Sequence, residues 1–165
     1  MFKVLTSILL LCLLPSYSWS LAEMYAASWS GELNYLILKK PPYVWGAATY
    51  ESADCSGYLY ATARKAGMPV LRTTAKEMAA GNSGWLGRTI DIDSAEELSV
   101  VFWTWSNKPD RPHGHVGALL LGKNTGLLMV THASPTRKGV VLDQLKGKLI
   151  TDISRVRHLI IGDPK

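Results

Sequence analysis

Asp54-Cys55-Ser56-Gly57 opens the stretch that decides the fold, and Tyr58-Leu59-Tyr60-Ala61-Thr62-Ala63-Arg64-Lys65-Ala66-Gly67 completes it. Asp54 is a favourable N-cap residue, and Gly67 is a stop signal, so the stretch predicts a helix that begins at Cys55. Its apolar residues recur at helical spacing, which predicts one buried face. The Cys55 thiol would lie near unpaired amides at the positive end of this helix, and both features favour the nucleophilic thiolate.

The composition indicates one globular domain. The chain has 165 residues, of which 47% are hydrophobic and 19% charged, so it can bury a core and is not disordered. Its formal net charge of +5 comes from scattered Lys and Arg residues, without a basic run or a recognition motif. We therefore expect weak attraction to anionic surfaces and no nucleic-acid partner.

The first 20 residues have the pattern of a secretory signal peptide, which leaves 21–165 as a single mature domain. A lysine is followed by an apolar run over 4–14 and by small residues that allow cleavage after Ser18 or Ser20. The run is too short to span a bilayer as a mature helix, and an uncleaved anchor is the alternative. We expect a periplasmic or secreted protein with no membrane attachment after cleavage.

Cleavage would also remove Cys12 and leave Cys55 as the one cysteine of the mature chain. Cys55 would then have no partner for an internal disulfide, in a compartment that tends to oxidise thiols. A leftover cysteine of this kind is a reactive thiol, an intermolecular link or a buried and inert residue.

The remaining pattern predicts helices first and then an antiparallel sheet, which is an α+β domain without repeats or linkers. Hydrophobic spacing predicts a first helix over 21–38, and Thr74-Ala75-Lys76-Glu77 is a capping box that opens a short helix to Ala80. Residues 85–97 are polar and turn-rich. Strands are expected at 98–105, 115–121, 127–133, 140–142 and 156–161.

The decisive geometry comes from a hairpin loop at Gly122-Lys123-Asn124-Thr125-Gly126. With the loop centred on its middle residue, His115 falls opposite Ala133 or, with a slip of one residue, opposite His132. Cross-strand neighbours have Cβ atoms about 4.5–5.5 Å apart. The two histidines are therefore expected side by side at the open end of the hairpin.

A cysteine at a helix start and two histidines on paired strands form an arrangement suited to nucleophilic acyl transfer. Cys55 would attack a carbonyl, and His115 would hold the proton and pass it to the leaving amine. His132 would fix the tautomer and orientation of His115. The backbone N–H of Cys55 and the hydroxyl of Tyr43 are candidate oxyanion donors, one such donor being worth ~3–4 kcal/mol.

Five stretches in this order resemble the NlpC-type cell-wall peptidases, which are papain-like cysteine hydrolases of bacterial peptidoglycan. They are Tyr43-Val44-Trp45-Gly46-Ala47, Asp54-Cys55-Ser56-Gly57-Tyr58, Leu71-Arg72-Thr73-Thr74, His115-Val116-Gly117 and His132-Ala133-Ser134. The resemblance covers roughly residues 40–160. It implies a papain-like α+β fold, with N-terminal helices packed on a central antiparallel sheet and the nucleophile at a helix N-terminus.

The resemblance also implies a Cys-His-His triad with Cys55 as nucleophile, His115 as base and His132 as orienting residue, and it places Tyr43 near the oxyanion. The implied reaction is hydrolysis of an amide bond in peptidoglycan stem peptides, without a cofactor or metal. The expected partners are these peptides, with an immunity protein or adaptor as a further candidate, and a monomer is expected.

Four residues around the predicted cleft are candidate substrate contacts, namely Asp54, Ser56, Arg72 and Trp45. Arg72 has an alternative role, in which it pins a loop through backbone carbonyls. Four tryptophans are candidates to line the groove, but core packing is expected for at least two of them: Trp45, Trp85, Trp103 and Trp105.

Three other functions fit part of the pattern. An amidase or acyltransferase acting on a lipid or protein amide would have the same triad and a more apolar cleft. A non-catalytic wall-binding domain would not need the intact triad. A zinc site could use His113 together with the triad residues, although no histidine pair has helical spacing. His158 is expected to be structural or exposed.

Overall fold

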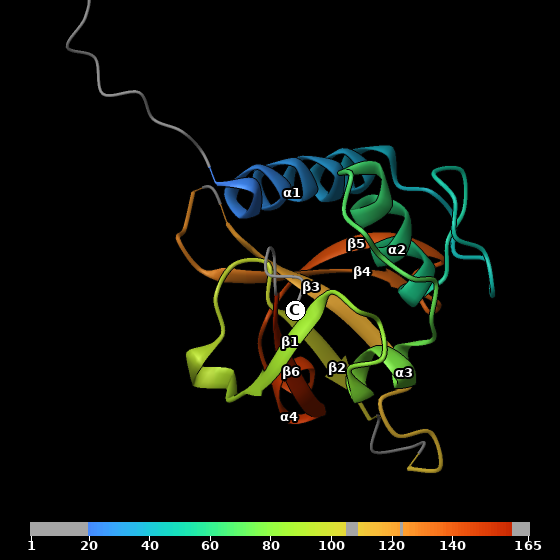
Figure 1. Cartoon of the computed structure of the whole chain (residues 1–165). Coiled ribbons are helices and arrows are strands. Elements are labelled where there is room, and N and C mark those ends of the chain that lie inside the picture. Colours follow the sequence, from blue (N-terminus) through green and yellow to red (C-terminus); the bar gives the residue numbers. More distant parts are fainter. Residues whose placement is uncertain (1–19, 105–108, 123, 160–165) are drawn as a thin grey trace, which may run out of the picture.

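The computed structural model describes residues 20–104, 109–122 and 124–159. These residues form helices followed by one antiparallel sheet, which confirms the predicted α+β class. Figure 1 shows helices α1 (Leu21–Lys39) and α2 (Cys55–Lys65) packed together on one face of the sheet. Apart from Ser20, the predicted signal peptide lies outside the described residues.

Helix α1 begins and ends where its capping residues predict. Ser20 accepts a hydrogen bond from the Glu23 backbone, and the Glu23 carboxylate accepts from the Ser20 backbone, so the two form a capping box. At the other end Lys40 adopts a left-handed conformation, with φ of 52°, before the two prolines. The helix buries Trp29, Leu33 and Leu36.

The cap of α2 confirms the predicted helix start. Asp54 accepts a hydrogen bond from the Gly57 backbone N–H through Oδ1, at 2.6 Å. One turn further on, Tyr58 is fully buried, and its hydroxyl lies 2.8 Å from the hydroxyl of Thr131 in the sheet. The capping box of Thr74 and Glu77 likewise opens the short helix α3 (Ala75–Ala80).

The sheet has six strands in the order β1-β6-β2-β3-β4-β5, and all neighbours are antiparallel. A 3₁₀ turn, η1 (Ile92–Ser94), follows the first strand, and a short helix, α4 (Lys148–Thr151), precedes the last. The strands are β1 (Leu86–Ile90), β2 (Val100–Trp103), β3 (His115–Leu121), β4 (Leu128–Ser134), β5 (Gly139–Gln144) and β6 (Ile153–Leu159).

Two of these elements were missed in the sequence. Strand β1 lies within the stretch that was interpreted as polar and turn-rich. It is an edge strand that pairs with β6 alone, so only Leu86 and Gly87 at its start are buried and the apolar signal is short. The single turn of α4 has no side-chain cap, so the sequence contains no capping signal that would predict it.

The alternation of side chains gives the sheet two apolar faces. The larger core lies under the helices, where Trp29, Leu33 and Leu59 pack against Val116 and Ala118. The opposite face holds a second, smaller core. Its buried members are Val101, Trp103, Leu119, Val130 and Val156.

The β3–β4 hairpin forms as predicted, but its register differs by one residue from the expected one. Ala118 pairs with Thr131 and Leu121 with Leu128, which continues to a pairing of Gly117 with His132. A hydrogen bond of 2.8 Å from the Gly122 backbone to Leu127 closes the loop. The expected pairing of His115 with Ala133 or His132 is therefore wrong. His115 and His132 are diagonal neighbours on one face.

The start of α2 lies against the loop before it, with no room for a side chain at Gly57. A Cβ atom at this position would lie 2.0 Å from the carbonyl oxygen of Ala47 and 3.0 Å from the Ala48 Cα. Both are backbone atoms, so the loop itself would have to move. This close approach is the reason for glycine at this position.

Replacing Gly57 with alanine should lower the free energy of unfolding by ~1–3 kcal/mol, because of this overlap. Gly31→Ala is the matched control, since Gly31 is also helical but has nothing within 4 Å of an added Cβ. That change should raise stability by ~0.5–1 kcal/mol. Urea unfolding of both variants checks this, and equal stabilities for Gly57→Ala and the unmodified protein would contradict the packing described.

Candidate active site

Cys55 is the first residue of α2, and its side chain lies against strand β3. The residue is 6% exposed. Backbone groups of Val116, Ser56 and Cys55 itself lie close enough to the sulfur to lower the pKa of the thiol. Since Val116 directly follows His115, the sulfur lies beside the start of β3, where the first predicted histidine is found.

The two histidines are joined by a hydrogen bond. Nε2 of His115 lies 2.8 Å from Nδ1 of His132. The rings meet edge to face with centroids 4.9 Å apart, and the residues are 3% and 5% exposed. The structure thus brings together the residues that the hairpin argument placed side by side.

The diagonal contact depends on the residue between the two rings. Gly117 lies opposite His132, and a Cβ on Gly117 would come within 3.0 Å of the His132 Cβ. The absent side chain leaves space for the His115 ring to cross toward the neighbouring strand. Trp103 supports both imidazoles, with ring centroids 5.4 Å from His115 and 5.8 Å from His132.

A third polar side chain, which sequence reasoning missed, extends this row. Asp143 on β5 places Oδ2 3.2 Å from Nε2 of His132, and Arg137 lies 2.7 Å from the other carboxylate oxygen. The available signal was a charged residue directly after the apolar strand predicted over 140–142. Strand alternation puts that residue two positions from Val141, the partner of His132.

Asp54, Ser56 and Arg72 bind one another around the start of α2. The Asp54 carboxylate accepts hydrogen bonds from the Gly46 and Gly57 backbones and from the Ser56 hydroxyl. Both of its oxygens also accept from the Arg72 guanidinium, and all of these bonds are 2.6–3.2 Å long. Arg72 also donates to the Ser56 hydroxyl at 2.7 Å. The three predicted substrate contacts therefore form an internal network, and their contact with substrate remains a prediction.

Arg72 in addition donates to the backbone carbonyl of Thr73, at 2.6 Å. This contact matches the alternative role, in which the guanidinium pins its own loop. Because Arg72 holds both the loop and the Asp54 carboxylate, it connects the start of α2 to the segment before α3.

Tyr43 is partly buried and belongs to the surroundings of the nucleophile. Burial, with smaller contributions from the charges of Cys55 and Asp54, raises the pKa of its hydroxyl to about 12. Its backbone is held by a hydrogen bond of 3.0 Å to the carbonyl of Lys138. The hydroxyl thus remains protonated and able to donate.

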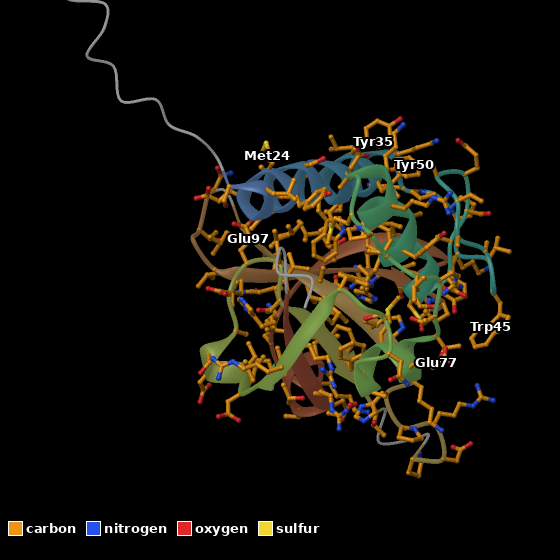
Figure 2. All side chains as sticks on the ribbon, in the orientation of Figure 1. Met24, Tyr35, Trp45, Tyr50, Glu77 and Glu97 are labelled. Atoms are coloured by element: carbon orange, nitrogen blue, oxygen red, sulfur yellow. The ribbon has the colours of Figure 1, made fainter. Side chains whose placement is uncertain are left out.

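The tryptophans divide between surface and core. Trp45 is 79% exposed, and Figure 2 shows its side chain directed away from the fold. Trp85 and Trp103 are buried, which confirms core packing for two of the four. Trp105 lies outside the described residues.

The remaining histidines have other partners. Nδ1 of His113 lies 2.7 Å from the Ser154 hydroxyl, and Nδ1 of His158 lies 2.9 Å from a carboxylate oxygen of Glu96 at the surface. Across 20–104, 109–122 and 124–159, no group of three or more His, Cys, Asp or Glu residues is arranged to hold a metal.

The low thiol pKa expected from the helix start is wrong for the free protein. Burial raises the pKa of Cys55 to about 11, and the charge of Asp54 adds to the rise. The backbone groups at the sulfur lower the pKa, but they do not offset these two effects. Removal of solvent outweighs the helix terminus.

Burial also keeps the imidazoles neutral. It lowers the pKa of His115 to about 3, with a contribution from His132. It lowers the pKa of His132 too, against the opposing hydrogen bond and charge of Asp143. At neutral pH the free site holds a thiol and two neutral rings.

The sequence profile of the NlpC/P60 family matches residues 40–156. The chain belongs to the NlpC/P60 family. It matches none of the curated proteins compared with it.

Solved NlpC/P60 structures share the fold. A lipoprotein-like NLP/P60 protein from Staphylococcus aureus superposes with a TM-score of 0.63 at 19% identity, over 91% of this chain and 46% of that one. The peptidoglycan hydrolase RipB from Mycobacterium tuberculosis gives 0.58 at 17% identity, over 83% and 67%. NlpC2 from Trichomonas vaginalis gives 0.57 at 18%, over 87% and 51%. The chain thus spans about half the length of the first of these proteins.

The depressed pKa of His115 predicts that this NlpC/P60 domain loses stability in mild acid. Below about pH 6.5 the unfolded chain protonates this ring, whereas the folded chain does so only near pH 3. The free energy of unfolding should therefore decrease as the pH is lowered below 6.5. This group contributes up to about 1.4 kcal/mol per pH unit to the decrease. His115→Gln should flatten the slope between pH 6.5 and 5. Urea denaturation at each pH measures the free energy of unfolding. Equal slopes of this free energy against pH for the unmodified protein and His115→Gln would contradict the lowered pKa of His115.

The raised thiol pKa predicts slow alkylation. Iodoacetamide should modify Cys55 more slowly than free cysteine at pH 8, and the rate should keep rising above pH 9, because burial raises the pKa to about 11. Intact mass spectrometry across a pH series measures the rate, with Cys55→Ala as the control for other sites. A rate that levels off below pH 8 would show a stable thiolate and contradict the neutral site.

Proposed function

We propose that this NlpC/P60 domain is a cysteine peptidase that hydrolyses amide bonds in the stem peptides of peptidoglycan. The family, whose members are generally cysteine hydrolases, and the resemblance to the peptidoglycan hydrolase RipB support the substrate class. The observation that carries the reaction type is the sulfur of Cys55 beside Val116, the residue that follows His115, together with the hydrogen bond between His115 and His132.

In this mechanism the Cys55 sulfur attacks the carbonyl carbon while its proton passes to Nδ1 of His115, the ring nitrogen that does not face His132. The tetrahedral oxyanion accepts hydrogen bonds from the Cys55 backbone N–H and the Tyr43 hydroxyl. The C–N bond then breaks, and His115 gives its proton to the leaving amine. A water molecule, deprotonated by the same ring, hydrolyses the thioester and restores the thiol.

Because the thiol is protonated in the resting state, His115 must accept its proton during the first step. A buried thiolate alone is unfavourable, and so is a buried imidazolium alone. Transfer of the proton from Cys55 to His115 creates the two charges side by side, where their attraction offsets both costs. Substrate binding is the event that couples this transfer to bond formation.

The rim of the site supplies candidates for peptide recognition. Trp45 presents an exposed aromatic face on the loop that leads to Cys55, and such a face can pack on the substrate. Arg72 already neutralises the Asp54 carboxylate, which weakens the case for direct capture of an acidic stem peptide. Contact of Asp54, Ser56 and Arg72 with the substrate remains a prediction.

Secretion by a cleaved signal peptide is part of the same proposal, since peptidoglycan lies outside the cytoplasm. Ser20 caps α1 through its capping box with Glu23, so cleavage after Ser18 would keep the cap and cleavage after Ser20 would remove it. We therefore favour Ser18. Among the described residues, no helix has both the length and the apolar content needed to cross a membrane. A monomer that meets an immunity protein or adaptor remains an expectation.

Cys55→Ala should abolish turnover of purified muropeptides, with a loss of at least ~10⁴-fold in kcat, because no other group supplies the nucleophile. The melting temperature should stay close to that of the unmodified protein. His158→Gln serves as the control and should keep full activity, since that ring pairs with Glu96 at the surface. Chromatography with mass spectrometry of the products measures both.

Retained turnover in Cys55→Ala would remove the nucleophile assignment. If the unmodified protein leaves muropeptides intact but cleaves a lipid or protein amide in a Cys55-dependent manner, the substrate class is wrong. The function would then be that of an amidase or acyltransferase with the same catalytic residues.

A further inference from the structure

The row of hydrogen bonds behind the nucleophile continues past the two histidines to an acidic residue. Asp143 is 14% exposed at its side chain and lies on β5, diagonal to His132 in the β4–β5 pairing. Its Oδ2 is 3.2 Å from Nε2 of His132, and Nδ1 of His132 is 2.8 Å from Nε2 of His115. The three side chains connect β5, β4 and β3 across one face of the sheet.

The acceptor-only chemistry of a carboxylate decides where the protons lie. An ionised Asp143 can only accept, so Nε2 of His132 must carry the proton. In a neutral ring Nδ1 is then an acceptor, and Nε2 of His115 must donate to it. The proton of His115 is thereby committed to Nε2, and Nδ1 holds the lone pair. Burial lowers the pKa of both rings, which is consistent with neutral imidazoles.

Arg137 determines which carboxylate oxygen faces the histidine. It lies 2.7 Å from Oδ1 of Asp143, so Oδ2 points to His132. Its backbone N–H donates to the Ser134 hydroxyl at 3.2 Å, which holds the turn between β4 and β5. A guanidinium has donors and no acceptor, so it selects an oxygen at the position of Oδ1.

We infer that Asp143 is a positioning residue that holds His132 and His115 in their Nε2–H tautomers, with Arg137 fixing the orientation of its carboxylate. In the proposed acyl transfer, this leaves Nδ1 of His115 as the acceptor of the Cys55 proton. The role in catalysis rests on the proposed function, whereas the tautomers can be measured without it.

Exchanging the carboxylate for an amide should reverse the direction of each hydrogen bond that connects residue 143, His132 and His115. In Asp143→Asn, Arg137 holds the amide oxygen, so the NH₂ group faces His132 and donates to its Nε2. The proton of His132 moves to Nδ1 and is donated to Nε2 of His115, whose own proton moves to Nδ1. His115 then presents a donor to the Cys55 thiol and cannot act as the base.

Removing Arg137 should relieve this reversal. In the double variant Asp143→Asn/Arg137→Met the amide can turn and present its oxygen to His132, which restores the original tautomers. In the presence of Asp143, Arg137→Met should have little effect on the tautomers, because the two carboxylate oxygens are chemically equivalent. A substitution that is mild by itself should therefore rescue a severe one.

The test combines ¹⁵N NMR of the imidazoles with kcat and KM on muropeptides, for the unmodified full chain, both single variants and the double variant. Couplings between ring protons and nitrogens identify the protonated nitrogen of each histidine. Asp143→Asn should move the protons of both rings to Nδ1 and lower kcat on the order of 10²–10⁴-fold with little change in KM. The double variant should recover both the tautomers and at least ten-fold of the activity. Asp93→Asn, an exposed aspartate on η1, is the control and should change neither readout.

Nδ1–H tautomers in the unmodified protein would overturn the inference, and this result does not depend on whether any variant folds. Unchanged tautomers and kcat in Asp143→Asn would also overturn it, as would a double variant less active than Asp143→Asn. If the tautomers respond as expected while the unmodified protein cleaves no muropeptide, the positioning role is supported and the proposed function is the part that fails.

Discussion

The buried carboxylate of Asp54 is the interaction on which the rest of the structure depends. It accepts from Gly46 in the preceding loop, from Gly57 in the first turn of α2 and from Arg72 before α3. Hydrogen bonds to charged groups are worth ~1.5–3 kcal/mol each, and a buried carboxylate without them is strongly unfavourable. The start of α2, and with it Cys55, is therefore held in one place over β3.

The same carboxylate has a chemical cost at the site that it organises. Its charge adds to burial in raising the pKa of Cys55, so the residue that orients the nucleophile also opposes its ionisation. A base that accepts the proton during attack resolves this conflict, and His115 lies on the adjoining strand. The row of His132 and Asp143 behind it provides the orientation that such a base needs.

Much of this arrangement could be predicted from the sequence because it depends on local signals. The caps of α1, α2 and α3 each depend on residues within three or four positions of one another in the sequence. The hairpin loop, which is also a local signal, brings His115 and His132 together. The exact register could not be predicted. It rests on where the Gly122 and Leu127 backbones close the loop, and a shift of one residue is invisible in a uniformly apolar hairpin.

The features that were missed are those that depend on contacts distant in the sequence. Asp143 acquires its role only when β5 pairs with β4, and β1 is recognisable only beside β6. The helix terminus alone predicts a lowered pKa for the Cys55 thiol, but burial by the rest of the fold raises the pKa instead. In each case tertiary packing decided the outcome.

The central claim is that Cys55, activated by the His115–His132 pair, forms a covalent intermediate with a peptidoglycan peptide. Acid quenching of the protein during muropeptide turnover, followed by proteolysis and mass spectrometry, tests this most directly. The account predicts an acyl adduct on the peptide that contains Cys55, with the mass of the substrate fragment on the carbonyl side of the cleaved bond. Turnover accompanied by an adduct on a different residue, or persisting at full rate with no adduct in a variant lacking the thiol, would contradict it.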